Sequence, residues 1–133
     1  MAKAEKADKA DKGAKGQAGR RLTIICAALA GALGVGLSAM AAHLADGHLL
    51  APAATMLLVH APALLALALW QGRLRLAVPA TLVLLLGMIL FSADLGYRTM
   101  FGSGMFPMAA PTGGVLMILG WILVGTGAIF RVR

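Results

Sequence analysis

The sequence has little charge, few aromatic residues and a single cysteine. Only 13% of its 133 residues are charged and 5% are aromatic, whereas 60% are hydrophobic. About a quarter of the residues of a soluble domain are charged, and so short a chain cannot bury this much apolar surface, which excludes an ordinary soluble enzyme. A wholly disordered chain is also excluded, because disorder needs low hydrophobicity. One cysteine excludes a disulfide framework and a cysteine-built zinc site.

The basic residues, which give a net charge of +7, are concentrated near the amino terminus. In residues 1–21 they are Lys3, Lys6, Lys9, Lys12, Lys15, Arg20 and Arg21. Acidic residues are interleaved with them, and Gly13, Gly16 and Gly19 oppose a helix. Because the segment has almost no apolar side chain larger than alanine to bury, it is predicted to be a disordered tail.

The binding role of this tail is left open between two interpretations. Its interleaved acids and its lack of aromatic stacking partners argue against nucleic acid as a partner. A basic segment beside a membrane helix can bind anionic lipids. It can also act only as a topology determinant, because basic flanks orient the first membrane helix.

Four apolar stretches follow the tail, at residues 22–44, 52–70, 76–95 and 112–130. At 1.5 Å per residue, each is close to the length needed to cross a hydrocarbon core of about 30 Å. The connectors between them are short, which makes sequential helices antiparallel neighbours. The sequence therefore predicts an all-α polytopic membrane protein with an antiparallel four-helix transmembrane bundle over residues 22–133. The surroundings expected for this bundle are the lipid bilayer.

The distribution of arginine and lysine predicts the orientation of this bundle. The tail, the 71–75 turn and the carboxyl end are basic, whereas the opposite side carries only Arg98. The protein is expected to be a multi-pass protein of the bacterial inner membrane. By the positive-inside rule, both of its termini are then expected to lie in the cytoplasm. A cleavable signal peptide ending near residues 38–42 is the competing interpretation, although the first apolar run is longer than a usual signal core.

Regularly spaced small residues predict where the helices pack. Lipid tails give helices no hydrophobic reason to associate, so close approach through small residues must hold them together. Seven-residue spacing keeps residues on one face, and it is found both in the fourth stretch and between Ala80 and Gly87 in the third. The first stretch has two small-xxx-small pairs, Ala30–Gly34 and Ala32–Gly36. The expected helix-packing glycines are Gly36, Gly87, Gly113, Gly120 and Gly127.

The few polar residues of the membrane region form a candidate polar cluster. The predicted topology brings His43, His60, Ser92 and Asp94 to the outer half of the bilayer. Ionisable groups in membranes usually face the bundle interior and are often functional. The cluster has three interpretations: a divalent metal site at His43, His60 and Asp94, a path for a proton or small solute, or hydrogen bonds that only join helices. No metal-ligand spacing supports the first, and the third is preferred, with Arg98 as a partner for Asp94.

Nothing in the residues indicates catalysis. Ser38 and Ser92 lack a neighbouring acid–histidine motif, and Gly34-Val35-Gly36 lies inside a spanning helix rather than in a phosphate-binding loop. We therefore expect no enzyme activity, no metal and no cofactor.

Several short motifs resemble a family of small membrane proteins catalogued as domain of unknown function 423. Residues 34–43 (GVGLSAMAAH) are similar to its first-helix signature, Leu-Gly-Ala-Phe-Gly-Ala-His, and residues 60–64 to its His-Ala-Leu motif. Residues 90–92 resemble its Leu-Phe-Ser run, and Pro111–Gly114 with Gly120-Trp121 resemble its Thr-Pro-x-Gly-Gly and Gly-Trp motifs. The resemblance covers residues 29–130 and implies four helices in a cytoplasmic membrane, without an established activity.

The chain departs from the family pattern at several positions, as a divergent member does. The departures are Ser38, Met40, Ala41, Met56, Pro62, Ala93-Asp94 and Ala110. The matched positions that could form a shared site are His43, His60 and Ser92. The sequence thus predicts a structural or accessory membrane protein that packs with itself or with a larger complex. Transport of a small solute or proton through the polar cluster is the alternative.

Overall fold

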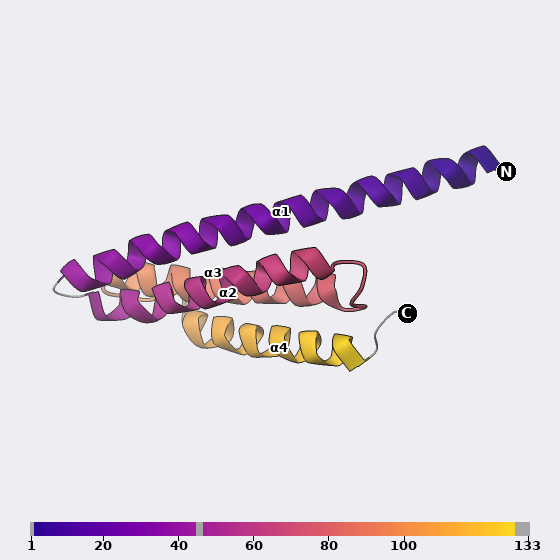
Figure 1. Ribbon diagram of the computed structural model, residues 1–133. Helices are drawn as coiled ribbons and strands as arrows, with labels where there is room; N and C mark the ends of the chain where they lie inside the picture. Colours follow the sequence, from indigo (N-terminus) through magenta and orange to yellow (C-terminus); the bar gives the residue numbers. More distant parts are fainter. Residues whose placement is uncertain (1, 45–46, 130–133) are drawn as a thin grey trace.

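The computed structural model describes residues 2–44 and 47–129, which form helices throughout, apart from their connections (Figure 1). The helices are α1 (Ala2–His43), α2 (Leu50–Trp70), α3 (Ala77–Phe101) and α4 (Ala109–Ile129), and a short 3₁₀ helix (Gly47–Leu49) precedes α2. Each of the four α-helices is long and apolar enough to cross a membrane. The all-α class and the four membrane-length helices are therefore as the sequence predicts.

The helices pack in chain order. α1 packs mainly on α2, and α4 packs mainly on α3. A smaller contact between α2 and α3 joins these two pairs. Figure 1 shows α1 and α4 on opposite sides of the central α2–α3 pair. The α1–α2 and α3–α4 connections lie at one end, and the α2–α3 turn lies at the other end, near the point where α1 leaves the bundle.

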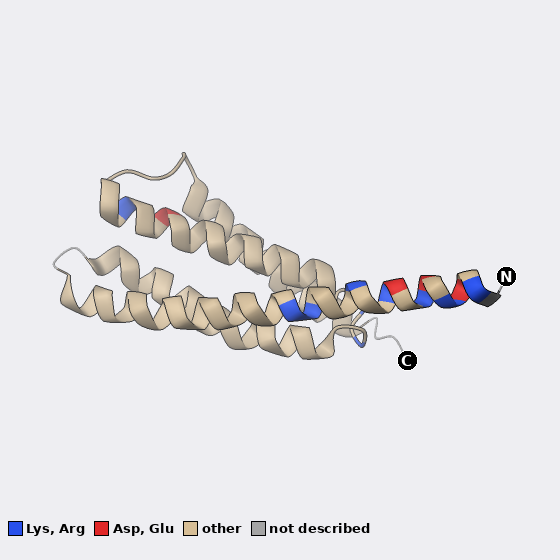
Figure 2. Ribbon diagram, turned by 90° about the horizontal axis from the view of Figure 1, so that it is seen from above, with Lys and Arg blue, Asp and Glu red and all other residues tan. Residues whose placement is uncertain are grey.

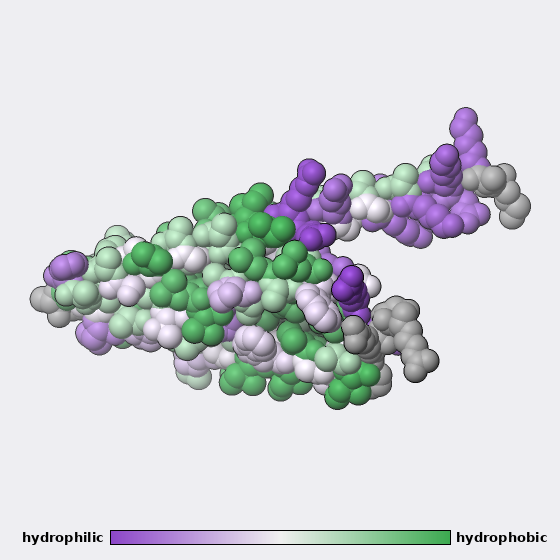
Figure 3. All heavy atoms as spheres, in the orientation of Figure 1, coloured by the Kyte–Doolittle hydropathy of each residue, from purple (hydrophilic) through white to green (hydrophobic). Residues whose placement is uncertain are grey.

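The interior is built from small residues, and large apolar side chains cover the outside. Leu64 and Leu84 are fully buried among alanines such as Ala27, Ala30 and Ala61. Many leucines, isoleucines and valines are exposed instead, and Figure 3 shows a largely apolar surface over the bundle and a polar one along the tail. Small interior residues let the helix backbones approach closely, which is the packing expected where lipid surrounds a protein.

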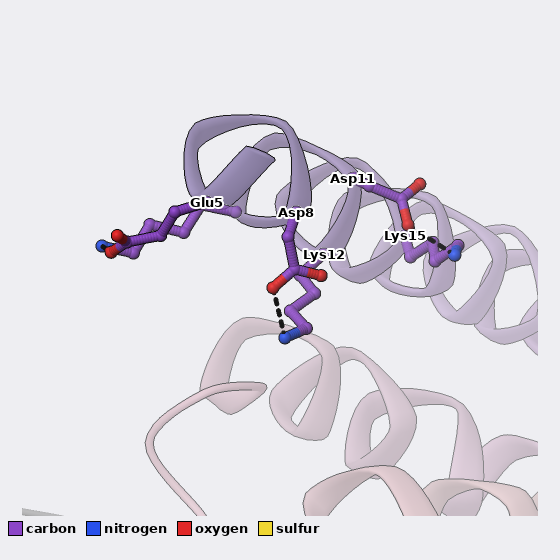
Figure 4. Close-up of polar contacts among 6 residues, drawn as sticks. Glu5, Asp8, Asp11, Lys12 and Lys15 are labelled. Carbon is purple, nitrogen blue, oxygen red and sulfur yellow. Dashed lines mark hydrogen bonds and ion pairs between the residues drawn. The ribbon is translucent and has the colours of Figure 1, made fainter. Parts of the chain in front are cut away.

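The helix at residues 2–21 differs from the predicted disordered tail. α1 is continuous from Ala2, and its 42 residues correspond to about 63 Å. Acidic residues precede lysines by four positions in three successive pairs, and Figure 4 shows the side chains turned toward one another. The N–O distances are 3.0 Å for Glu5–Lys9, 2.7 Å for Asp8–Lys12 and 2.6 Å for Asp11–Lys15. This four-residue spacing of acids and lysines supports a helix, although the segment has almost no large apolar side chain to bury.

Two helix boundaries also differ from the predicted ones. α3 continues to Phe101 rather than stopping at residue 95, and Gly102 ends it in the left-handed conformation, with φ 72°. Its N–H donates to the carbonyl of Arg98 at 2.9 Å, the usual way to close a helix at glycine. α4 begins at Ala109, so Pro111 lies in its first turn, where the missing N–H costs nothing. The last residue of the predicted 112–130 stretch is outside the described residues.

Candidate functional site

His60 lies in the middle of α2 and is 4% exposed. Its Nδ1 lies 2.8 Å from the carbonyl oxygen of Met56, one turn earlier. Its Nε2 lies 3.3 Å from the indole nitrogen of Trp121 on α4. A carbonyl can only accept and an indole N–H can only donate, so the neutral ring with its proton on Nδ1 satisfies both partners. His60 is thus a hydrogen-bonded link between α2 and α4.

Ser92 occupies a buried position on α3 that faces α2. Its hydroxyl donates to the carbonyl of Ala53 at 3.5 Å. This bond crosses from α3 to α2 and does not involve His60. The structure therefore separates Ser92 from His60 and gives each its own interhelical partner.

Asp94 is completely buried near the end of α3. Its Oδ2 accepts from the Nε of Arg98 at 2.7 Å, and its Oδ1 accepts from the backbone N–H of Met105 at 2.8 Å. The carboxylate is closed off from water, because the 102–108 connection folds over it. A side chain at Gly104 would begin 2.6 Å from Nη2 of Arg98, so glycine is what leaves room for the ion pair there.

His43 does not join the other polar residues. It is exposed at the end of α1, whereas His60 and Asp94 are buried. Across residues 2–44 and 47–129, no three His, Cys, Asp or Glu side chains come together in a way that could hold a metal ion. The candidate cluster is therefore divided into an α2–α4 link, an α3–α2 link and an anchor for the α3–α4 connection.

Two polar partners were not identified from the sequence. In the sequence Trp121 stands out only as part of a Gly-Trp motif, although an indole N–H within a span needs an acceptor. Gln71 donates to Thr23 at 3.4 Å and so ties the α2–α3 turn to α1. Thr23 in turn donates to the carbonyl of Gly19 at 3.0 Å. Both residues could have been found in the sequence, because a polar side chain within or beside an apolar span needs a hydrogen-bond partner.

The seven-residue glycine series lies along the α3–α4 contact. A Cβ at Gly87 would be 2.7 Å from the carbonyl oxygen of Gly113, and one at Gly113 would be 2.6 Å from the amide nitrogen of Phe91. A Cβ at Gly120 would be 2.6 Å from Cγ of Leu84, and one at Gly127 would be 3.1 Å from Cβ of Leu76. The backbones of α3 and α4 are therefore in direct contact around Gly87 and Gly113.

Gly36 is not a packing residue, which corrects the expectation for α1. It is exposed, and a Cβ there would find nothing within 4 Å. The close approach of α1 to α2 is at Gly34, where a Cβ would be 2.8 Å from Cγ of Leu58. Ala30–Gly34 is thus the small pair that faces α2, and Ala32–Gly36 faces away from it.

Comparison with known proteins supplies one match. A family model described as "Protein of unknown function (DUF423)" matches residues 24–114. These residues include His60, Ser92 and Asp94, and the paired glycines Gly87 and Gly113. No curated protein and no solved structure matches the chain.

Proposed function

The chain belongs to the DUF423 family of proteins of unknown function, and from this premise we propose that it is a small structural or accessory component of the bacterial inner membrane. It has no catalytic activity of its own. It packs through its outer apolar faces with further copies or with a larger membrane complex.

The observation that carries this proposal is the complete pairing of the buried polar groups. In the described part of the chain, no buried side-chain nitrogen or oxygen lacks a hydrogen-bond partner. His60, Ser92 and Asp94 each bond within the protein. A proton or solute path needs polar groups that exchange partners with what passes, whereas a packing role needs groups that keep their partners.

The proposed arrangement is an antiparallel bundle with both termini in the cytoplasm. Figure 2 shows the Lys and Arg residues gathered along the tail and at the end of the bundle that it adjoins. Arg98, at the other end, is paired with a buried carboxylate and so adds little free charge there. This asymmetry supports the orientation by the positive-inside rule.

The orientation is tested by labelling of single cysteines in intact cells, with Cys26→Ala as the background. Ser103→Cys in the α3–α4 connection is expected to react with an impermeant maleimide from outside. Gln17→Cys on the tail is expected to react only after the membrane is opened. Reaction of Gln17→Cys in sealed cells would reverse the orientation.

The accessory role is tested by photo-crosslinking in the native membrane. A photoreactive residue in place of Leu119, which is 47% exposed, is expected to form an adduct of one defined mass. The same residue in place of the fully buried Leu84 is the control and is expected to crosslink only within the chain. Absence of any protein adduct from Leu119 and from further exposed positions would contradict the accessory role.

A flux measurement distinguishes the transport alternative. The purified protein, reconstituted into vesicles with a trapped pH dye, is expected to leave proton leak at the level of protein-free vesicles. Leak that rises with the protein and falls in His60→Gln would overturn the accessory proposal in favour of transport.

A further inference from the structure

We propose that the groove between α1 and α3 binds one anionic phospholipid. The phosphate lies at Arg20 and an acyl chain runs along Cys26 and Leu85. The site rests on the membrane placement proposed above, and it goes beyond a general attraction of the basic tail to lipids because it has a defined polar end and a defined apolar end.

The groove consists of three adjoining cavities. The first, of about 420 Å³, is lined by Gln17, Arg20 and Gln71 among others. The second, of about 220 Å³, shares Gln71 with the first and adds Cys26 and Leu85. The third, of about 190 Å³, shares Cys26 and Leu85 with the second. Shared lining residues make the three cavities one continuous groove with one polar end.

The groove exists because α1 packs mainly on α2 and leaves its side toward α3 uncovered. Gly16 and Gly19 line this side, and a Cβ on either would find nothing within 4 Å. Gln71 and Thr23, which both line the second cavity, are joined by a hydrogen bond of 3.4 Å. Figure 3 shows the polar tail rising away from the bundle at this end of the molecule.

Arg20 supplies an uncompensated positive charge at the polar end. Each acidic residue of the tail is already paired with a lysine four positions later. Arg20 makes no ion pair within the described residues, so its guanidinium is available to a further anion. Arginine suits a phosphate because its planar fork offers two parallel N–H donors. The neighbouring amides of Gln17 and Gln71 offer additional polar contacts to a headgroup.

The apolar end matches a lipid tail in length and position. From Leu22 to Leu33 the groove follows α1 for about 16 Å, at 1.5 Å per residue. This is close to half of a hydrocarbon core of about 30 Å, which is the depth of one leaflet. A soluble anion would occupy only the polar end and would leave these apolar residues without an occupant. A membrane phospholipid occupies both ends, so the shape of the groove favours a phospholipid over a soluble anion.

The test is lipid titration of the full-length protein in mild detergent, followed by native mass spectrometry. The probes are phosphatidylglycerol and phosphatidylcholine with the same acyl chains, and glycerol phosphate as the isolated headgroup. Phosphatidylglycerol is expected to bind with a stoichiometry of one and more tightly than the other two.

Arg20→Gln is expected to weaken the binding of phosphatidylglycerol about fivefold, which is the effect of one basic residue near a lipid surface. Arg75→Gln, exposed at the same end but outside the groove, is the matched control and is expected to leave binding unchanged.

A second pair of variants tests whether the lipid lies in the groove itself. Gly16→Leu places a side chain in the groove, whereas Gly36→Leu places one on the exposed side of the same helix. Neither added Cβ meets an atom within 4 Å, so both variants are expected to fold, which circular dichroism checks. Only Gly16→Leu is expected to lose phosphatidylglycerol binding. Bound phosphatidylglycerol is also expected to slow alkylation of Cys26, the one cysteine of the chain, in the unmodified protein.

Three results would overturn the proposal. Equal binding of the two phospholipids would remove the anionic specificity. Equal weakening by Arg20→Gln and Arg75→Gln would show diffuse surface charge instead of a site. Binding of glycerol phosphate as tight as that of phosphatidylglycerol would identify a soluble anion. Failure of the protein to float with vesicles in a density gradient would instead contradict the membrane placement, so the two failures are distinguishable.

Discussion

Trp121 on α4 donates its indole N–H to Nε2 of His60 on α2, across 3.3 Å. The two rings are tilted by 54°, with centroids 6.1 Å apart. α2 and α4 are not consecutive in the chain. α2 packs on α1 and α3, whereas α4 packs on α3. This hydrogen bond therefore joins two helices, α2 and α4, that have little other contact with each other.

A double-mutant cycle measures what this bond contributes. Trp121→Phe removes the donor and keeps an aromatic ring, and His60→Leu removes the acceptor. Interhelical hydrogen bonds in membranes contribute about 0.6 kcal/mol on average, so a coupling energy near that value is expected between the two changes. The measurement is reversible unfolding of the four proteins in mixed micelles with increasing SDS. Strictly additive effects would show that the bond adds nothing to stability.

Gly113→Ala is expected to lower the free energy of unfolding by about 2 kcal/mol, as overpacking does. The added methyl would lie 2.6 Å from the amide nitrogen of Phe91 and 2.8 Å from the carbonyl oxygen of Gly87, and neither backbone atom can move aside alone. Gly114→Ala is the matched control, because its methyl would find nothing within 4 Å. The control is expected to be neutral or slightly stabilising, since alanine favours a helix over glycine. Similar SDS midpoints for the two variants would contradict this account of the α3–α4 contact.

Asp94→Ala is expected to cost about 3 kcal/mol, in the range found when one partner of a buried ion pair is removed. It leaves the N–H of Met105 without an acceptor and Arg98 without its carboxylate. Asp94→Asn keeps an oxygen for Met105, so the loss is expected to be smaller. Limited proteolysis of the 102–108 connection reports the anchor directly, with faster cleavage expected in Asp94→Ala than in Asp94→Asn. Equal cleavage rates in these two variants and the unmodified protein would mean that Asp94 does not hold the connection.

The combined change Glu5→Gln, Asp8→Asn and Asp11→Asn is expected to reduce helicity in residues 2–21. Each exposed pair contributes about 0.3 kcal/mol to the helix, so the three together are comparable with the cost of one glycine. Circular dichroism at low salt is the measurement, and the same loss is expected in the unmodified protein at 1 M salt, because salt screens exposed pairs. Lys3→Gln with Lys6→Gln removes two lysines outside the three pairs and serves as the control. A loss of helicity in the control equal to that of the triple change would assign the effect to net charge.

The four spans could be read from the sequence because each depends on local composition. A run of apolar residues long enough for a bilayer needs no knowledge of its neighbours, since a helix satisfies its own backbone. The seven-residue recurrence of Gly113, Gly120 and Gly127 was readable for the same reason. The four-residue spacing from Glu5 to Lys9 is equally local, and it indicates a helix at residues 2–21 that the lack of large apolar side chains did not predict.

The partners of the polar residues could not be read in this way. Ala30–Gly34 and Ala32–Gly36 are the same motif displaced by two residues, which places them about 200° apart on the helix. Only the position of α2 decides that Gly34 packs and Gly36 does not. For Asp94 the sequence indicates Arg98 as a partner, but only the folding of the 102–108 connection adds the N–H of Met105 and buries the carboxylate.

The sequence by itself determined that this protein is helical, apolar enough to span a membrane four times, and basic at one end, because these properties follow from composition and spacing along one segment. The tertiary structure alone decided that His60 meets Trp121, that Asp94 is buried against Met105, and that an open groove beside Arg20 separates α1 from α3. Those contacts join residues between 11 and 61 positions apart in the chain, and no local pattern encodes which helix faces another.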